Sequence, residues 1–538
     1  MTESHARQPA TSHQPPTAAP AFPPTLQQYL SPALWEQLQA EPTRRGLLLD
    51  ALGALHSLIY LLATYLPRPL VESLKRDPAL GNVTGEQLEG TLFFADVSGF
   101  TALTERLAAL GRAGSAELTT HLNTYFDLMV QILARSDGTL LKFGGDALLA
   151  YFPAQDAGHH ALWATRAAQR MMRAMKNFAG LETPAGPVTL RMKVGLSTGP
   201  FGTAAVGRPK RMEYFIFGET VTRTLRVEST LTAGQIGIDA ATAAWLPPEQ
   251  YQPHTADFFT LTASPETLDD FEIRPETYRR GRDSGLLMLA RAELYEHFET
   301  ALQQLAALSA FLPAPLVSEI ITYAYQRYLP GENRPMAILF LHLTGPQSLW
   351  DPADSMTLPR VVQALDACFA AILDSVARHG GVISHIDPYD NGSKFLILFS
   401  ALTEPNAAPL RAVQAALEAR ARLIALRAQW AQAGDPVPGL SVRGGLTYNS
   451  PFASPVGAAI RREYTVMGDE VNLAARLMAA AQPEQLLVAP SVISAIENAV
   501  ALTPLAPMKL KGKRDPVPVA QVDGLRVAAA IGNSPKRR

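Results

Sequence analysis

The sequence has a single cysteine, Cys368, among 538 residues. One thiol excludes an intramolecular disulfide framework and a cysteine-based metal site within one chain, and it fits a reducing cytoplasm. The chain also has little net charge, because 47 Lys and Arg residues oppose 49 Asp and Glu residues. It therefore lacks the basic excess that would indicate nucleic acid or an anionic membrane as a partner.

Long uninterrupted apolar runs are missing as well. The segment Gly46 to Leu66 is nearly long enough to span a bilayer, but Asp50 and His56 interrupt it. We therefore expect an amphipathic helix that packs on a domain, and a membrane role is the less favoured alternative. The N-terminus is rich in Pro, Thr, Ala and His and has no basic segment before an apolar core. This composition predicts disorder rather than a secretory signal, and hence a cytoplasmic protein.

A short apolar run that ends in a carboxylate is the most informative stretch. The run Leu92 to Ala95 predicts a buried strand that ends at Asp96. Gly99 allows a sharp turn, and Thr101 can cap a helix that begins there. A carboxylate beside the free amides of a new helix suits a metal–phosphate pair, although Asp followed by Gly is also common in ordinary turns.

A second carboxylate lies in a predicted hairpin. The stretch Asp137 to Phe152 contains two short strands with Asp146 at the turn between them, next to Gly145. A hairpin tip can be brought beside the end of a neighbouring strand. Asp96 and Asp146 could therefore hold divalent cations together.

The chain repeats itself once. The segment TYLPRPLVESL from Thr64 returns as AFLPAPLVSEI from Ala310, with an offset of 246 between matching prolines. The segment that contains Gly218 returns around Gly468, with an offset of 250. Two copies of one fold in series are therefore the predicted architecture.

The two acidic motifs in this order resemble those of the class III nucleotidyl cyclases, the adenylyl and guanylyl cyclases. The resemblance is carried by DVSGFT from Asp96 and by KFGGD from Lys142. It implies α/β, ferredoxin-like domains in tandem that pair as an intramolecular pseudo-heterodimer, so a monomer is expected. It also implies ATP as the substrate and two Mg²⁺ or Mn²⁺ ions per active site, with Asp96, Asp146 and Val97 as the metal-binding residues.

The resemblance divides the remaining site residues between the copies. Asn472 and Arg476 are four residues apart, on one face of a predicted helix. They match the asparagine that orients the ribose and the arginine that stabilises the pentavalent phosphorus. The first copy has Thr222 in place of Asn472, and the second copy has His342 and Ser393 in place of the aspartates. Together the copies supply one complete set, whereas an ordinary polar helix face is the alternative for Asn472 and Arg476.

Other residues are expected to bind the substrate. The resemblance assigns phosphate binding to the segment at Gly99, Phe100 and Thr101 and to Lys511, and base recognition to Thr465 and His385. His385 stands where adenylyl cyclases commonly have a lysine, and histidine lacks the fixed charge of lysine at neutral pH. A guanylyl cyclase and a catalytically weak, nucleotide-binding regulatory protein are therefore the alternatives.

The second cleft of such a pair is expected to contain no carboxylates. There Lys142 and Arg226 of the first copy would face His342 of the second, and two cations without acidic partners would form an anion pocket. Bicarbonate is the activator that the resemblance implies for this pocket. The alternative is that Lys142 pairs with a nearby acid.

The expected domain organisation follows from the repeat and from composition. A disordered tail at 1–44 and a helical lead-in at 45–88 precede the first cyclase domain at 89–271. A connector and helical bridge at 272–333 lead into the second cyclase domain at 334–523, and a disordered tail at 524–538 follows.

Overall fold

The computed structural model describes residues 22–526, apart from residues 80, 109–110, 155–158, 185, 263–290, 325–330, 347–349, 352–356, 401–406, 436, 438 and 511–514. The chain forms two compact units. The helical unit comprises Met1–Tyr60 and Pro275–Leu305, and the α/β unit comprises Leu61–Arg274 and Ala306–Arg538. Both copies of the repeat lie in the α/β unit.

The helical unit contains η1 (Pro24–Tyr29), α1 (Pro32–Ala40), and most of α2 (Arg45–Ala63) and α9 (Arg291–Ala310). Ser31 caps α1 by accepting a hydrogen bond from the amide of Leu34 at 3.3 Å. Leu26 and Leu38 are fully buried. The expectation of a disordered tail up to residue 44 is therefore wrong for η1 and α1. Their prolines occupy first-turn positions, where the missing N–H costs no helical hydrogen bond.

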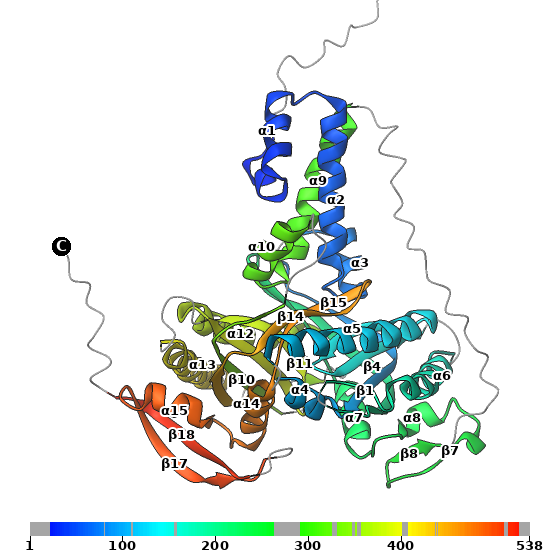
Figure 1. The fold of residues 1–538 in the computed structure, drawn as a ribbon, viewed down its shortest axis with the longest axis vertical. Helices are drawn as coiled ribbons and strands as arrows, with labels where there is room; N and C mark the ends of the chain where they lie inside the picture. Colours follow the sequence, from blue (N-terminus) through cyan, green and yellow to red (C-terminus); the bar gives the residue numbers. More distant parts are fainter. Residues whose placement is uncertain are drawn as a thin grey trace, which may run out of the picture. The chain divides into compact units, whose positions relative to one another are not determined.

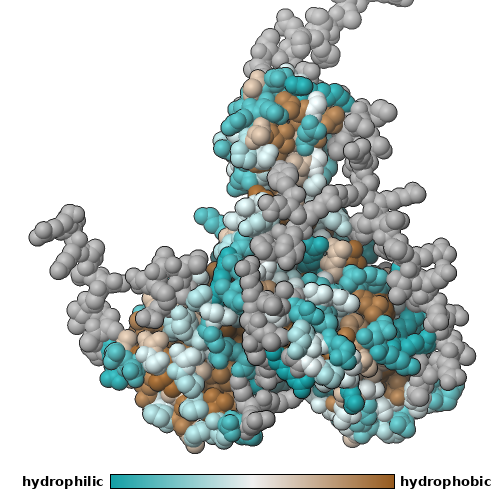
Figure 2. Space-filling view, viewed as in Figure 1, coloured by the Kyte–Doolittle hydropathy of each residue, from teal (hydrophilic) through white to brown (hydrophobic). Residues whose placement is uncertain are grey.

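Helix α2 forms within the apolar segment from Gly46 to Leu66. Among the described residues it is the one helix long and apolar enough to cross a membrane by length and composition, and 39% of its apolar window is buried inside the protein. Core helices of globular proteins meet the same criteria. On the visible face of the α/β unit, apolar patches alternate with polar residues, as on an ordinary protein surface (Figure 2).

The first copy is built on one mixed sheet with the strand order β2-β3-β1-β4-β6-β8-β7, and β5 pairs with β4. Its helices and strands are α3 (Arg68–Arg76), β1 (Thr84–Ser98), α4 (Phe100–Ala108), α5 (Gly111–Arg135), β2 (Thr139–Gly144), β3 (Ala147–Pro153), α6 (His159–Ala174), η2 (Met175–Phe178), β4 (Arg191–Arg208), β5 (Arg211–Phe217), α7 (Glu219–Ser229), β6 (Ile236–Asp239), α8 (Ala240–Ala243), η3 (Pro248–Gln250), β7 (Tyr251–Pro253) and β8 (Phe258–Leu261). Strand β1 is central and antiparallel to both β3 and β4.

The second copy has the corresponding order β11-β12-β10-β13-β16-β18-β17, with β9, β14 and β15 in a small separate sheet. Its helices and strands are α10 (Ala314–Tyr323), β9 (Glu332–Asn333), β10 (Met336–Thr344), α12 (Leu358–Arg378), β11 (Val382–Pro388), β12 (Gly392–Ser400), α13 (Ala407–Gln432), β13 (Ser441–Asn449), β14 (Phe452–Ala458), β15 (Arg461–Met467), α14 (Asp469–Ala480), β16 (Leu486–Val488), α15 (Pro490–Ile496), β17 (Val500–Met508) and β18 (Val517–Leu525). The α/β class and the tandem architecture are therefore confirmed (Figure 1).

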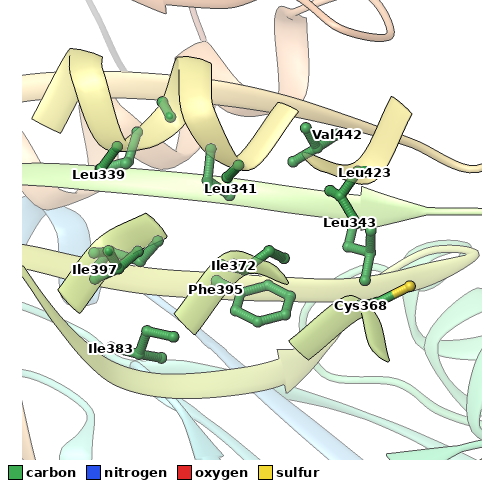
Figure 3. Close-up of a cluster of buried hydrophobic side chains, with 14 of the residues drawn as sticks. Leu339, Leu341, Leu343, Cys368, Ile372, Ile383, Phe395, Ile397, Leu423 and Val442 are labelled. Carbon is green, nitrogen blue, oxygen red and sulfur yellow. The ribbon is translucent and has the colours of Figure 1, made fainter. Parts of the chain in front are cut away.

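The core of the second copy lies between its sheet and the helices α12 and α13. Leu341 and Phe395 of neighbouring strands lie in one apolar cluster with Ile372 and Cys368 of α12 (Figure 3). Cys368 is fully buried, and this burial raises the pKa of its thiol to about 12. The single cysteine is therefore a core residue.

Each copy extends a β-hairpin that packs in the core of the other copy. The β4–β5 hairpin of the first copy packs in the core of the second, where the rings of Phe215 and Phe369 are 5.9 Å apart. Reciprocally, Val456 of β14 packs in the core of the first copy. The amide of Gly207 donates to Asp366 at 2.8 Å, and the amide of Gly457 donates to Asn123 at 3.1 Å. These matched contacts show an intramolecular pair with approximate twofold symmetry.

Candidate active site

The two acidic motifs meet where two neighbouring strands of the first sheet end and begin. Strand β1 ends just after Asp96, and its neighbour β3 begins just after Asp146 at the tip of the β2–β3 hairpin. The register pairs Ala95 with Leu148, so the next residues of each strand bring both aspartates to the same end of the strand pair. Both side chains are partly buried. Gly145 supports the tip with a φ of 78°.

A buried tyrosine on α5, Tyr125, is affected by the charges of both carboxylates. The ring of Tyr125 packs at 5.7 Å from both Phe100 and Phe178, and its hydroxyl is buried with no hydrogen-bond partner in the part of the chain that the structure describes. Burial, followed by the charges of Asp146 and Asp96, holds the pKa of Tyr125 well above its ordinary value. One hydroxyl therefore lies within the field of both aspartates. The sequence did not single out Tyr125, because a tyrosine in an apolar helical period is typical of a core residue.

The donor set fits a hard divalent cation. Two carboxylates provide oxygen ligands of the kind that Mg²⁺ prefers, and Mg²⁺ usually keeps waters or binds substrate phosphates at its other positions. The described residues contain no group of three or more His, Cys, Asp and Glu that could hold a metal ion. The Val97 side chain is buried in β1, and only its backbone carbonyl could contribute.

The start of α4 lies directly after the first aspartate. Gly99 adopts a φ of 107°, and a Cβ atom there would come within 2.7 Å of the carbonyl oxygen of Thr189. Its own carbonyl accepts the first helical hydrogen bond, from Leu103 at 3.0 Å. The Phe100 side chain is in the core, so only its backbone can face a phosphate. The side chain of Thr101, like Lys511, lies outside the described residues.

The second copy contributes α14 to this region. Asn472 and Arg476 lie one turn apart on α14, and α14 packs against α4 across the interface between the copies. The Nη1 atom of Arg476 is buried and has no hydrogen-bond partner among the described residues. A buried donor without a partner is costly by about 1–3 kcal/mol unless a ligand satisfies it. The helix that carries this buried Nη1 atom thus packs on α4, the helix that follows Asp96.

The two residues expected to recognise the base lie in β11 and β15. Thr465 is buried. His385 lies between two carboxylates, with Nδ1 at 3.6 Å from Glu463 and Nε2 at 3.6 Å from Asp387. Burial raises the pKa of Glu463, and the charge of Asp387 adds to this increase against the opposing charges of His385, Arg461 and Lys142. Asp387 is two residues from His385 in β11, so the alternation of side chains along a strand could have indicated it. Glu463 approaches His385 only in the folded structure.

Lys142 of β2 occupies the position that His385 has in β11. Each of these two residues follows a shift in the register with which its strand pairs with the next strand. The Nζ atom of Lys142 lies 3.1 Å from Glu213, and both side chains are less than a tenth exposed. Arg211 also contacts Glu213, at 3.0 Å. Burial would raise the pKa of Glu213, but the charges of Lys142 and Arg211 lower it overall. The prediction that Lys142 has no carboxylate partner is therefore wrong, because β5 places Glu213 beside it.

Arg226 likewise has partners. Its guanidinium donates to Asn391 of the second copy at 3.3 Å and lies 3.8 Å from Glu219. The expected anion pocket of two cations without acidic neighbours is thus not formed by Lys142 and Arg226 as they lie in this structure.

The second copy has a different chemistry at the positions of the aspartates. His342 is buried, and its Nδ1 accepts a hydrogen bond from Arg443 at 3.1 Å. Burial, followed by the charge of Arg443, lowers the pKa of His342 to about 4. Ser393 is buried opposite Pro388 in the longer hairpin. The Nδ1 atom of His342 is thus engaged by Arg443, and neither His342 nor Ser393 supplies the carboxylate that Asp96 and Asp146 supply in the first copy.

The comparisons with known proteins agree with this architecture. The family model of the adenylate and guanylate cyclase catalytic domain matches the chain twice, at residues 85–272 and 330–521. The chain therefore belongs to the class III nucleotidyl cyclase family and carries two tandem catalytic domains.

Among its relatives is adenylate cyclase type 10 of Mus musculus, 24% identical over 466 residues, which cover 82% of this chain and 27% of the relative. Adenylate cyclase 1 of Rhizobium meliloti is 30% identical over 179 residues, 33% of this chain and 26% of that protein. The chain thus spans 27% of the length of the mouse relative. A solved class III adenylyl cyclase-like ATP-binding protein from Pseudomonas aeruginosa shares the fold, with a TM-score of 0.53 and 12% identity over 79% of this chain and 92% of that one.

Proposed function

We propose that this protein converts ATP into cyclic AMP and pyrophosphate at one active site built from both copies. The observation that carries the proposal is the division of the site: Asp96 and Asp146 lie in the first copy, whereas Asn472 and Arg476 lie on α14 of the second, which packs on α4. The relatives named adenylate cyclase favour ATP over GTP.

The carboxylates of Asp96 and Asp146, with the carbonyl of Val97, would hold two Mg²⁺ or Mn²⁺ ions. When bound, such cations neutralise the triphosphate and make the ribose 3′-hydroxyl easier to deprotonate. The 3′-oxygen of the substrate attacks the α-phosphorus in line, and pyrophosphate leaves. The Tyr125 hydroxyl would donate to a carboxylate oxygen and hold that ligand in a fixed orientation.

The second copy would act on the reacting phosphoryl group. Arg476 supplies a guanidinium that meets the negative charge as it develops on the α-phosphate oxygens, so its effect is largest in the transition state. Asn472 orients the ribose, and Thr465 and His385 contact the base. The amides at Gly99 to Thr101, with Lys511, bind the leaving phosphates.

A nucleotide-binding regulatory protein with little turnover is the second candidate. It is favoured by His385, which is held between Glu463 and Asp387 where a lysine would supply a fixed charge. The cyclase-like neighbour from Pseudomonas aeruginosa, described as an ATP-binding protein, is a further reason to consider it. Because Lys142 is paired with Glu213, bicarbonate activation is not part of the proposal.

A direct assay separates these functions. The purified full chain is incubated with ATP or GTP and with Mg²⁺ or Mn²⁺, and cyclic nucleotide and pyrophosphate are quantified. The proposal expects cyclic AMP and pyrophosphate in equal amounts, with ATP preferred. ATP binding without product in either metal would support the regulatory protein, and preferred formation of cyclic GMP would support a guanylyl cyclase.

A further inference from the structure

A cavity of about 300 Å³ lies on the first copy, away from the catalytic residues. It is bounded by α3, the first residues of β1, the β4–β5 hairpin and the last residues of α9. Its volume is that of a pocket for a small organic molecule. Apolar and polar groups both line it, including Leu70, Phe311, Tyr214, Thr203 and Glu86.

The equivalent place in the second copy is occupied by an arginine. Arg334 contacts Glu319 of α10 at 3.2 Å and also contacts Glu332 of β9. Burial alone would lower the pKa of Arg334, but the hydrogen bond with Glu332 and the charges of both acids raise it overall. Burial and the charge of Glu319 raise the pKa of Tyr464 to about 12, while the charge of Arg334 opposes this increase. A guanidinium thus lies among two acids and a tyrosine.

The strand registers establish which residues correspond. Glu86 pairs with Thr203, and Glu332 pairs with Ala453. Thr203 and Ala453 are 250 residues apart, the same offset that relates Gly218 to Gly468. Glu86 and Glu332 are 246 apart, the offset of the repeated proline motif. Glu86 is therefore the counterpart of Glu332.

The same offset gives the other counterparts. Ser73 corresponds to Glu319, and Leu88 corresponds to Arg334. The first copy thus has the tyrosine and one of the two acids of the arrangement, but it has no arginine at the central position. This difference leaves a cavity where the second copy has a guanidinium.

The electrostatics of the cavity favour a cation. Glu86 is exposed, and no ion pair among the described residues involves it. Glu86 and Tyr214 both line the cavity. Burial raises the pKa of Tyr214, the hydrogen bond with Thr203 opposes this increase, and the charge of Glu86 adds to it. The other two charged residues of the lining are Asp77 and Arg76, which offset each other. Glu86 therefore supplies the net charge.

We propose that this cavity binds a small organic cation, an alkylguanidinium or alkylammonium compound, in the place that Arg334 occupies in the second copy. The charged head would pair with Glu86 beside the Tyr214 ring, where a cation also gains from the aromatic face. The alkyl part would pack on Leu70 of α3 and on Phe311, the residue that follows α9, both of which line the cavity. The second copy shows that this backbone accommodates a guanidinium.

Calorimetric titration of the full chain with butylguanidinium chloride tests the proposal, with sodium butyrate and sodium chloride as controls for the alkyl group and for ionic strength. One saturable site is expected. Glu86→Gln should weaken it by about tenfold or more, because it removes a charge-assisted hydrogen bond. The matched variant Glu332→Gln should leave the affinity within about twofold, since its acid contacts Arg334. No saturable binding, or equal losses in both variants, would overturn the proposal.

Leu88→Arg provides a second, independent variant. It supplies the arginine that the first copy lacks, so it should abolish butylguanidinium binding. It should also raise the melting temperature of the chain in the absence of ligand, as a bound ligand would. Wild-type affinity in a folded Leu88→Arg variant would show that the cation does not occupy this position. The test does not depend on cyclase activity, so it remains informative if the proposed function fails.

Discussion

The two copies share a fold and differ in the charge at equivalent positions. At the end of the central strand the first copy has Asp96, close to a second carboxylate, whereas the second has His342, kept neutral by burial and by Arg443. On the helix that follows the exchanged β-hairpin, the second copy has Asn472 (α14) and the first has Thr222 (α7). One backbone thus carries two different sets of side chains, and in the proposed function each set supplies half of the reaction.

The largest effect is expected from removal of a carboxylate in the first copy. Asp96→Asn keeps the shape but not the charge, and cyclic AMP formation should fall by about 1,000-fold or more because the cation loses a ligand. The matched change His342→Asn in the second copy should alter the rate by less than about threefold. Steady-state assays of both variants at saturating Mn²⁺ check this. Equal losses would show that both edges take part in metal binding.

The next effect concerns the arginines of the two equivalent helices. Arg476→Ala should lower kcat by about 100-fold with little change in KM, because its contact with the phosphoryl oxygens strengthens in the transition state. Arg226→Ala in the first copy should leave both constants within about threefold. A change confined to KM in Arg476→Ala would mean that the guanidinium binds only the ground state.

A smaller effect is expected at the tyrosine beside the aspartates. Tyr125→Phe should weaken Mn²⁺ binding by about tenfold, measured by electron paramagnetic resonance without turnover, because the variant cannot make the hydrogen bond that Tyr125 is proposed to donate to a carboxylate ligand once the cation is bound. Thermal stability should not fall, since the removed hydroxyl has no partner in the described part of the protein. Tyr151→Phe is the control: its hydroxyl donates to Glu89 at 2.9 Å, so it should lower stability and leave Mn²⁺ binding unchanged.

The smallest effect is a pH dependence of stability in the second copy. The pKa of His342 is lowered from its ordinary value to about 4, so between these values the unfolded chain binds a proton that the folded chain does not. Stability is therefore unaffected by this group at neutral pH and falls as the pH drops toward 4, by up to about 3 kcal/mol. Urea unfolding of wild type and His342→Gln should show a shallower acid decline in the variant. Parallel curves would contradict the shift.

Much of the fold was predictable because the elements near the site have strong local signals. The apolar run before Asp96 forms the buried end of β1, and the glycine turns at Gly99 and Gly145 have the positive φ values that such turns need. The offset of the repeat predicted the second copy, and the sheets confirm it.

The remaining features depend on contacts between distant segments, which local patterns do not encode. Glu213 is separated from Lys142 by 71 residues, so the sequence could not show that the lysine is paired. Tyr125 has the helical spacing of a core residue, and only the sheet places its hydroxyl near two aspartates. The helices at 24–40 were missed because their prolines suggest disorder, whereas burial of Leu26 and Leu38 stabilises them. The other expected domain boundaries and the cytoplasmic location stay predictions.

The central claim is that the two copies form one nucleotide site and not two. Calorimetric titration of the full chain with 3′-deoxy-ATP and Mn²⁺ measures this directly, because the analogue lacks the hydroxyl that attacks and cannot be cyclised. The account predicts one molecule bound per chain, with the metal-dependent binding lost in Asp96→Asn and retained in His342→Asn. Two molecules per chain, or unchanged binding in Asp96→Asn, would contradict it.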